Sequence, residues 1–190
     1  MNAPQQSRIT WQDNIFTESE LQSIHHIAAQ IKQGLNTNID QNPDMSASRR
    51  TSETTWLDLN QQTAWLYKKV SDLALEINSE TYGFELTGIQ PFQYTVYRST
   101  VQGQYPWHSD LSLVSDQDNI RKLSLSIILS KNTEYTGGRF LFSPTGTTVE
   151  ISQQYNRLIV FPSWTPHCVM PVQSGTRISL VSWLHGKAFK

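Results

Sequence analysis

Residues 167–185, HCVMPVQSGTRISLVSWLH, contain two runs rich in β-branched and aromatic residues, separated by the turn-forming residues QSGT. Short runs of this composition between turn signals predict β-strands. Five further runs of the same kind lie upstream: FQYTVYRS (92–99), RKLSLSIILS (121–130), GGRFLFS (137–143), TTVEIS (147–152) and NRLIVFP (156–162). Seven or eight such strands predict a mainly β fold, either a sandwich or a jelly roll.

The first third of the chain predicts helices instead. In FTESELQSIHHIAAQIKQGL (16–35), Thr17 and Glu20 have capping-box spacing, and the apolar residues follow one helical face: Leu21, Ile24, Ala28, Ile31 and Leu35. A second amphipathic helix fits NQQTAWLYKKVSDLALEINSE (60–80), with the stripe Leu66, Val70, Leu73 and Ile77. The polar segment between them predicts an exposed loop that leads into a short strand at 54–57.

Length and composition favour a single domain, 1–190, with a helical part at about 15–85 and a β core at about 89–187. The net charge of -1 gives no electrostatic reason to bind nucleic acid or an anionic membrane. A single cysteine, Cys168, excludes an internal disulfide. The polar start of the sequence does not resemble a secretory signal, and no apolar run is long enough to span a bilayer. We therefore expect a cytoplasmic protein.

The stretch GQYPWHSDLSL (103–113) places His108 and Asp110 two residues apart. If it lies at the end of a strand, the two side chains share one face and offer a nitrogen and an oxygen to the same point, while Ser109 turns away. Taken alone, this spacing is weak evidence for a metal site, because a hydrogen-bonded pair is the commoner outcome.

His167 strengthens the hypothesis because it begins a predicted strand, and Arg177 begins the next. Two imidazoles and one carboxylate form a set that leaves three positions open on Fe(II), whereas zinc usually takes four ligands. Three open positions suit a bidentate 2-oxoacid and dioxygen. The guanidinium of Arg177 matches a carboxylate, although it could instead pair with Glu150.

Several other residues are assigned by their strand face or by their side-chain type. Ser179 shares a strand face with Arg177 and could add a hydroxyl donor, and Tyr97 could donate its phenol to the same carboxylate. Tyr94, on the opposite strand face, is the alternative to Tyr97. The remaining aromatic, histidine and cysteine side chains are expected to serve packing or to lie on the surface: Trp107, Trp164, Trp183, His25, His26 and Cys168.

Four separated segments resemble the iron(II)- and 2-oxoglutarate-dependent oxygenases, specifically the prolyl 4-hydroxylase-like branch in its bacterial and phage-type form. They are SRRTSETTWL (48–57), YRSTVQGQYPWHSD (97–110), RKLSLSIILSKNTEYTGGRFLF (121–142) and FPSWTPHCVMPVQSGTRISLVSWLHG (161–186). The resemblance implies a double-stranded β-helix, a cupin-like jelly roll, with N-terminal helices packed on one sheet. It implies Fe(II) held by His108, Asp110 and His167, and 2-oxoglutarate bound by Arg177 with Tyr97 assisting.

The same resemblance implies an activity. Such enzymes hydroxylate an unactivated C–H bond while dioxygen converts 2-oxoglutarate to succinate and CO2, and ascorbate can serve as the reductant. Asp110 favours hydroxylation, because halogenating relatives lack that ligand. Trp183 stands where nucleic-acid demethylases of this superfamily carry a second arginine, which disfavours a nucleic-acid substrate.

As the substrate we expect a peptide or protein residue, with proline-type hydroxylation; the alternatives are a free amino acid or small metabolite, or a binding module without catalysis. The polar loop at 36–52 and the stretch 111–119 are the predicted lids. The predicted rim contacts are Arg49, Tyr105, Trp107 and Arg139. The oligomeric state, monomer or homodimer, is left open.

Overall fold

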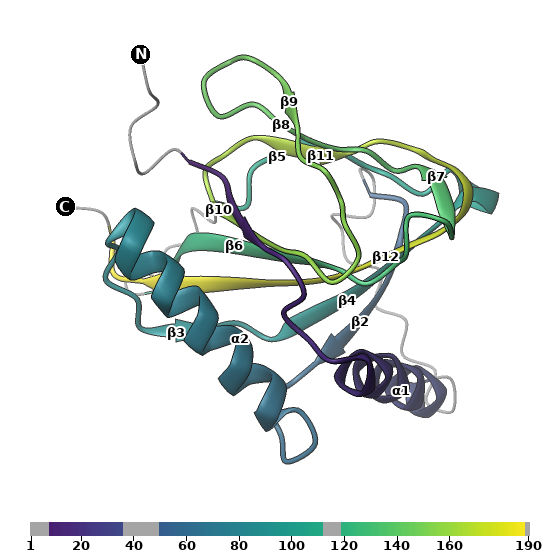
Figure 1. The fold of residues 1–190 in the computed structure, drawn as a ribbon, viewed down its shortest axis with the longest axis horizontal. Helices are drawn as coiled ribbons and strands as arrows, with labels where there is room; N and C mark the ends of the chain where they lie inside the picture. The colour runs from purple at the N-terminus through teal and green to yellow at the C-terminus, as the bar shows by residue number, and fades with distance from the viewer. Residues whose placement is uncertain (1–7, 36–49, 112–118, 189–190) are drawn as a thin grey trace.

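Two antiparallel sheets face each other in the computed structural model, and two helices cover the outer face of the larger sheet (Figure 1). The structure describes residues 8–35, 50–111 and 119–188. The helices are α1 (Glu18–Leu35) and α2 (Ala64–Ile77), the latter followed by a π-helical turn (Asn78–Tyr82). The strands are β1 (Thr10–Gln12), β2 (Glu53–Leu57), β3 (Gly88–Ile89), β4 (Phe92–Arg98), β5 (Tyr105–His108), β6 (Ile120–Ile128), β7 (Tyr135–Gly137), β8 (Phe140–Phe142), β9 (Val149–Glu150), β10 (Leu158–Pro162), β11 (His167–Val169) and β12 (Val172–Gly186).

The larger sheet has the strand order β1-β10-β6-β12-β4-β2, and the smaller sheet has the order β5-β11-β8-β9. The long strand β12 forms the centre of the larger sheet, where it pairs with β6 and β4 along most of its length and with β3 and β7 nearer its ends. Most strands therefore pair with strands that do not follow them directly in the sequence. The arrangement confirms the predicted jelly roll with N-terminal helices packed on one sheet.

Both faces of the larger sheet are covered, which explains why its strands are so apolar. Along β6, Leu123, Leu125 and Ile127 are fully buried in the core shared with the helices, together with residues such as Ile24 and Leu66. The alternate residues face the smaller sheet, where a second core forms from Tyr97, Ile128, Phe140, Phe142, Ile159, Phe161, Val169 and their neighbours. The space between the sheets is therefore lined by every second residue of each strand.

The predicted helix signals are confirmed in α1. The Thr17 amide donates to Glu20 Oε2 at 2.7 Å, and the Glu20 amide donates to Thr17 Oγ1 at 3.3 Å, which completes the capping box. Lys69 of α2 then donates to both oxygens of the same Glu20 carboxylate. The N-terminus of α1 is thus joined to the second helix.

Some predicted boundaries were wrong. The run TTVEIS contributes only the two-residue strand β9, and the second helix begins at Ala64 rather than Asn60. Asn60 instead accepts backbone hydrogen bonds from Gln62 and Thr63 in the preceding turn. Strand β1, which lines up against β10, was not predicted. Most of the two predicted lids lies outside the described residues.

Within the described part of the chain, no helix is long and apolar enough to cross a membrane.

Asn156 joins the segment before α1 to the β core. Its side chain accepts a hydrogen bond from the Phe16 amide at 2.9 Å and donates to the Phe16 carbonyl at 2.7 Å. Its backbone has a φ of 63°, a left-handed conformation that asparagine tolerates better than most residues. Asn156 therefore fixes both a turn and the approach of the chain to α1.

We expect Asn156→Ala to lower the free energy of unfolding by about 2–3 kcal/mol, because it leaves a buried amide and a buried carbonyl of Phe16 without partners. Urea denaturation measures this change. Gln154→Ala, at an exposed neighbouring position, is the control and should be close to wild type. Equal stability of the two variants would show that the bridge to Phe16 does not hold the segment.

Candidate active site

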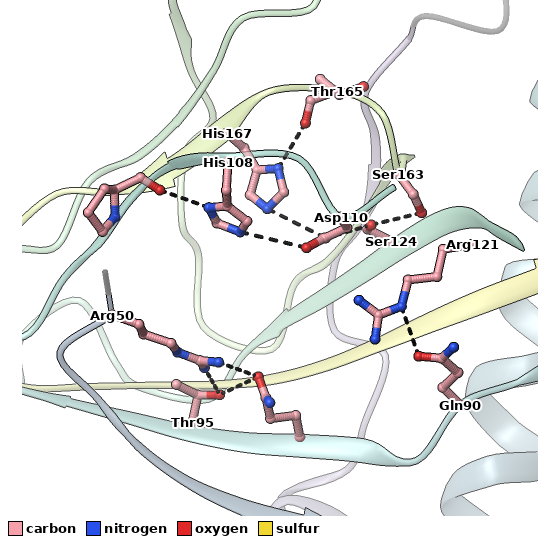
Figure 2. A network of polar contacts seen from close by, with 12 residues as sticks. Arg50, Gln90, Thr95, His108, Asp110, Arg121, Ser124, Ser163, Thr165 and His167 are labelled. Carbon is pink, nitrogen blue, oxygen red and sulfur yellow. Dashed lines mark hydrogen bonds and ion pairs between the residues drawn. The ribbon is translucent and has the colours of Figure 1, made fainter. Parts of the chain in front are cut away.

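Three side chains of types that can hold a metal ion meet at one end of the smaller sheet. Strand β5 pairs with β11 so that His108 lies directly opposite His167, and just beyond β5 the Asp110 amide donates to the Ser163 carbonyl at 2.8 Å. The ligand atoms of the three side chains all lie within 4.8 Å of one another. Figure 2 shows both imidazoles pointing toward the Asp110 carboxylate. The chain therefore brings together the three residues that the sequence singled out.

Backbone carbonyls fix the tautomer of both histidines. His108 Nδ1 lies 2.8 Å from the Pro106 carbonyl, and His167 Nδ1 lies 2.9 Å from the Thr165 carbonyl, so each Nδ1 carries the hydrogen and donates it. The lone pair of each Nε2 then faces Asp110, at 3.6 Å from Oδ1 for His108 and 3.5 Å from Oδ2 for His167. This orientation is the one that a metal ligand requires.

The Asp110 carboxylate has a hydroxyl behind it and two imidazoles in front. Ser124 of β6 donates to Oδ2 at 2.7 Å, and Ser163 lies 3.1 Å from the same hydroxyl. Burial acts to raise the pKa of Asp110, but the two imidazoles and the nearby donors outweigh it and hold that pKa below its usual value. Burial, followed by the proximity of His167, lowers the pKa of His108 to about 4. A neutral imidazole beside an ionised carboxylate suits a divalent metal.

A cavity of about 240 Å³ extends from these ligands to the inner face of the larger sheet. Arg177 of β12 lines it and is 1% exposed. Its Nε donates to Gln153 Oε1 at 2.6 Å and its Nη1 donates to Ser179 Oγ at 3.3 Å, both neutral partners. Burial lowers the pKa of Arg177, and the nearby Tyr97 and Tyr135 act against that shift. Within the described residues this buried cation has no carboxylate partner, so it can bind an anion from outside the chain.

The strand faces decide which of the predicted residues reach the cavity. Tyr97, Ser179 and Tyr105 line it. Tyr94 lies on the opposite face of β4, where its phenol is 2.7 Å from His25 Nδ1 of α1. Tyr97 is therefore the tyrosine of β4 that is near Arg177, and its ring centroid lies 5.2 Å from the guanidinium carbon.

Two predicted rim contacts lie elsewhere. Arg139 is bonded to Glu150 at 2.8 Å and is not part of the cavity lining, because its neighbour Phe140 takes the inward position on β8. Trp107 is 44% exposed and also lies outside the lining. Arg49 falls outside the described residues. Trp183, expected to serve core or rim packing, lines the cavity.

Sequence reasoning missed several residues of the site, namely Arg50, Trp56, Gln93, Arg121, Ser124 and Gln153. Arg50 and Trp56 belong to the quoted segment SRRTSETTWL, but nothing in the local pattern indicates that β2 lies beside β4. Ser124 and Ser126 did carry a signal. They are polar residues at alternate positions within an otherwise apolar strand, which is typical of a strand face that lines a functional site.

Comparison with known proteins gives a consistent result. A family model of the 2OG-Fe(II) oxygenase superfamily matches residues 92–185. A PKHD-type hydroxylase of Synechococcus sp. (strain CC9902) is 34% identical over 89 residues, which are 47% of this chain and 39% of the relative. A PKHD-type hydroxylase of Colwellia psychrerythraea is 28% identical over 92 residues, 48% of this chain and 41% of the relative. The match thus spans about two fifths of the length of these relatives.

Solved structures agree with the fold over nearly the whole chain. A prolyl-4-hydroxylase of Pseudomonas putida superposes with a TM-score of 0.68 at 18% identity, covering 95% of this chain and 93% of that one. A viral collagen prolyl hydroxylase of Paramecium Bursaria Chlorella virus-1, in a 2OG complex, gives 0.70 at 21% identity, with coverage of 94% and 96%. At these identities the likeness concerns the fold.

We expect Asp110→Ala to abolish measurable binding of Co(II), whose visible spectrum reports its ligands, because the carboxylate supplies one of only three protein ligands. Ser124→Ala should weaken Co(II) binding about 10-fold, since it removes the hydroxyl that orients this carboxylate. Titration of the metal-free protein measures both effects, with Ser109→Ala as an exposed control that should match wild type. Wild-type affinity in Ser124→Ala would show that Asp110 needs no such support.

Proposed function

Because this chain, through residues 92–185, belongs to the 2OG-Fe(II) oxygenase superfamily, we propose that it is an Fe(II)- and 2-oxoglutarate-dependent dioxygenase that hydroxylates a peptide or protein residue. The observation that carries the proposal is the presence, in one cavity, of three converging metal ligands and a buried arginine without a carboxylate partner among the described residues. A metal site alone would not need the arginine. A 2-oxoacid that chelates the metal and reaches Arg177 with its second carboxylate uses both.

In this proposal His108, Asp110 and His167 hold Fe(II) and leave three of its positions open. Arg177 binds the distal carboxylate of 2-oxoglutarate, with Ser179 and Tyr97 as additional donors close to it. When bound, the metal and 2-oxoglutarate use dioxygen to form succinate and CO2 and supply the oxidising power for C–H hydroxylation. The aromatic side chains Phe140 and Phe161 exclude water from the adjoining wall. Ascorbate is the proposed reductant.

The substrate class is supported by a structural neighbour that holds a peptide. That neighbour, from Trichoplax adhaerens, is a prolyl hydroxylase in complex with a hypoxia inducible factor peptide fragment, and it superposes with a TM-score of 0.70 at 18% identity. We extend that class to this chain and propose proline-type hydroxylation. Tyr105, which lines the cavity, is the proposed substrate contact.

Anaerobic titration with Fe(II) and 2-oxoglutarate tests the proposal through the visible charge-transfer band of an iron-bound 2-oxoacid. Wild type should give the band. Arg177→Ala should raise the 2-oxoglutarate concentration that gives half of the maximal band intensity by at least about 10-fold, because the substitution removes a charge-assisted contact. Arg139→Ala is the matched control, since Arg139 is exposed and paired with Glu150.

Folded wild-type protein that gives no band would overturn the proposal and favour a binding module without catalysis. If wild type and Arg177→Ala need the same 2-oxoglutarate concentration to form the band, the proposed iron site is retained but Arg177 has no role in 2-oxoglutarate binding. Circular dichroism of each variant shows whether it is folded.

A further inference from the structure

Two more arginines line the cavity, and neither the metal nor 2-oxoglutarate requires them. We propose that Arg50 and Arg121 bind a carboxylate group of the primary substrate, so that this protein acts on acidic substrates. The inference rests on the proposed function and makes its substrate class more specific.

The charges of the proposed machinery cancel without these two residues. Fe(II) and Arg177 together carry three positive charges, and Asp110 and the 2-oxoglutarate dianion together carry three negative charges. Arg50 and Arg121 therefore remain as two uncompensated cations in a cavity that already holds its metal and co-substrate. Cations in a partly desolvated site are stabilised chiefly by an anion of good geometry, which a substrate carboxylate would supply.

Arg50 is held in place entirely by neutral groups. Its Nη1 donates to Gln93 Oε1 and its Nη2 to Thr95 Oγ1, both at 2.8 Å. The guanidinium carbon lies 5.0 Å from the centroid of the Tyr105 ring. Its Nε is buried and has no hydrogen-bond partner among the described residues. The side chain is thus fixed in position, with its Nε–H unused and no described carboxylate to neutralise its charge.

Arg121 shows the same combination on the other side of the site. Its Nε donates to Gln90 Oε1 at 2.9 Å, and its guanidinium carbon lies 3.8 Å from the centroid of the Trp183 ring. Burial lowers the pKa of Arg121, which Asp110 partly offsets from a distance. Among the described residues it forms no salt bridge. The partner of the Arg121 guanidinium is therefore the neutral amide oxygen of Gln90, which does not neutralise its charge as a carboxylate would.

The two guanidinium groups face a common space. Figure 2 shows Arg50 and Arg121 on opposite sides beneath the three candidate metal ligands, Arg50 coming from the segment before β2 and Arg121 from β6. Both line the same cavity as His108 and His167. A carboxylate bound there would hold the rest of its molecule beside the metal ligands, which suits recognition of a group near the C–H bond that reacts. A guanidinium recognises a carboxylate through paired hydrogen bonds better than it recognises an amide.

Matched pairs of acid and amide probes test this idea. The first pair is the capped tripeptide acetyl-Glu-Pro-Gly-amide and its Gln counterpart; the second is acetyl-Gly-Pro-Glu-amide and its Gln counterpart; the third is L-proline and L-prolinamide. Each probe is added anaerobically to the wild-type complex with Fe(II) and 2-oxoglutarate, and binding is read from the shift of the charge-transfer band. At least one acid should bind about 10-fold or more tightly than its amide partner, as expected for a charge-assisted contact.

The variants assign that preference to the two arginines. Arg50→Gln and Arg121→Gln should each reduce the ratio of acid to amide affinity toward one, and Arg50→Lys should restore part of it, because the charge remains. Arg139→Gln, which changes an arginine outside the cavity, should keep the full ratio. A preference confined to the tripeptides identifies a peptide side chain as the source of the carboxylate, and one confined to L-proline identifies a small molecule.

The outcomes separate this inference from the proposed function. If no charge-transfer band forms in folded wild type, the proposed function fails and this inference fails with it. If the band forms but every acid binds no better than its amide, or if the preference survives both glutamine variants, the inference alone is overturned.

Discussion

The register between β5 and β11 is the constraint on which the site depends. It sets His167 opposite His108, and the bond from the Asp110 amide to Ser163 fixes the residue that follows the strand. A shift by one residue would turn the histidine of the shifted strand to the other face. The carboxylate also needs Ser124 from β6, so the site forms only when the smaller sheet is closed over the larger one.

The larger sheet can carry polar residues on its inner face because its outer face is so thoroughly buried. Leu180 and Leu184 of β12 pack in the core beneath the helices, and each such side chain contributes about 1.5–3 kcal/mol through burial. The alternate residues of β12, including Arg177 and Ser179, lie on the inner face and line the cavity. Without α1 and α2, the apolar outer face of this sheet would be exposed to water. The guanidinium on its inner face would then lack a rigid support.

Local periodicity explains which parts of the site the sequence could predict. His108 and Asp110 lie two residues apart, and Arg177 shares its strand face with Ser179, so alternation along a strand is sufficient to group them. Which face of a strand points into the cavity depends on the layers that pack against it. Tyr94 faces α1, where its phenol contacts His25, and Tyr97 is therefore the tyrosine on the cavity side. Arg50 reaches the cavity because β2 joins the sheet beside β4. Such sheet order comes from pairing between distant segments, which the spacing of residues does not encode.

Among the described residues, the cavity lining combines three guanidinium groups with a single carboxylate, an arrangement that costs stability. Aromatic rings and neutral acceptors reduce this cost, through Trp183 beneath Arg121 and through Gln93 and Thr95 beside Arg50. They do not remove the charge, so the excess of positive charge in the cavity lining favours the binding of anions. Arg177 is 1% exposed, whereas Arg50 and Arg121 are only partly buried. This difference in burial agrees with the two proposals, in which Arg177 binds a small dianion and the more accessible Arg50 and Arg121 bind a carboxylate of a larger substrate.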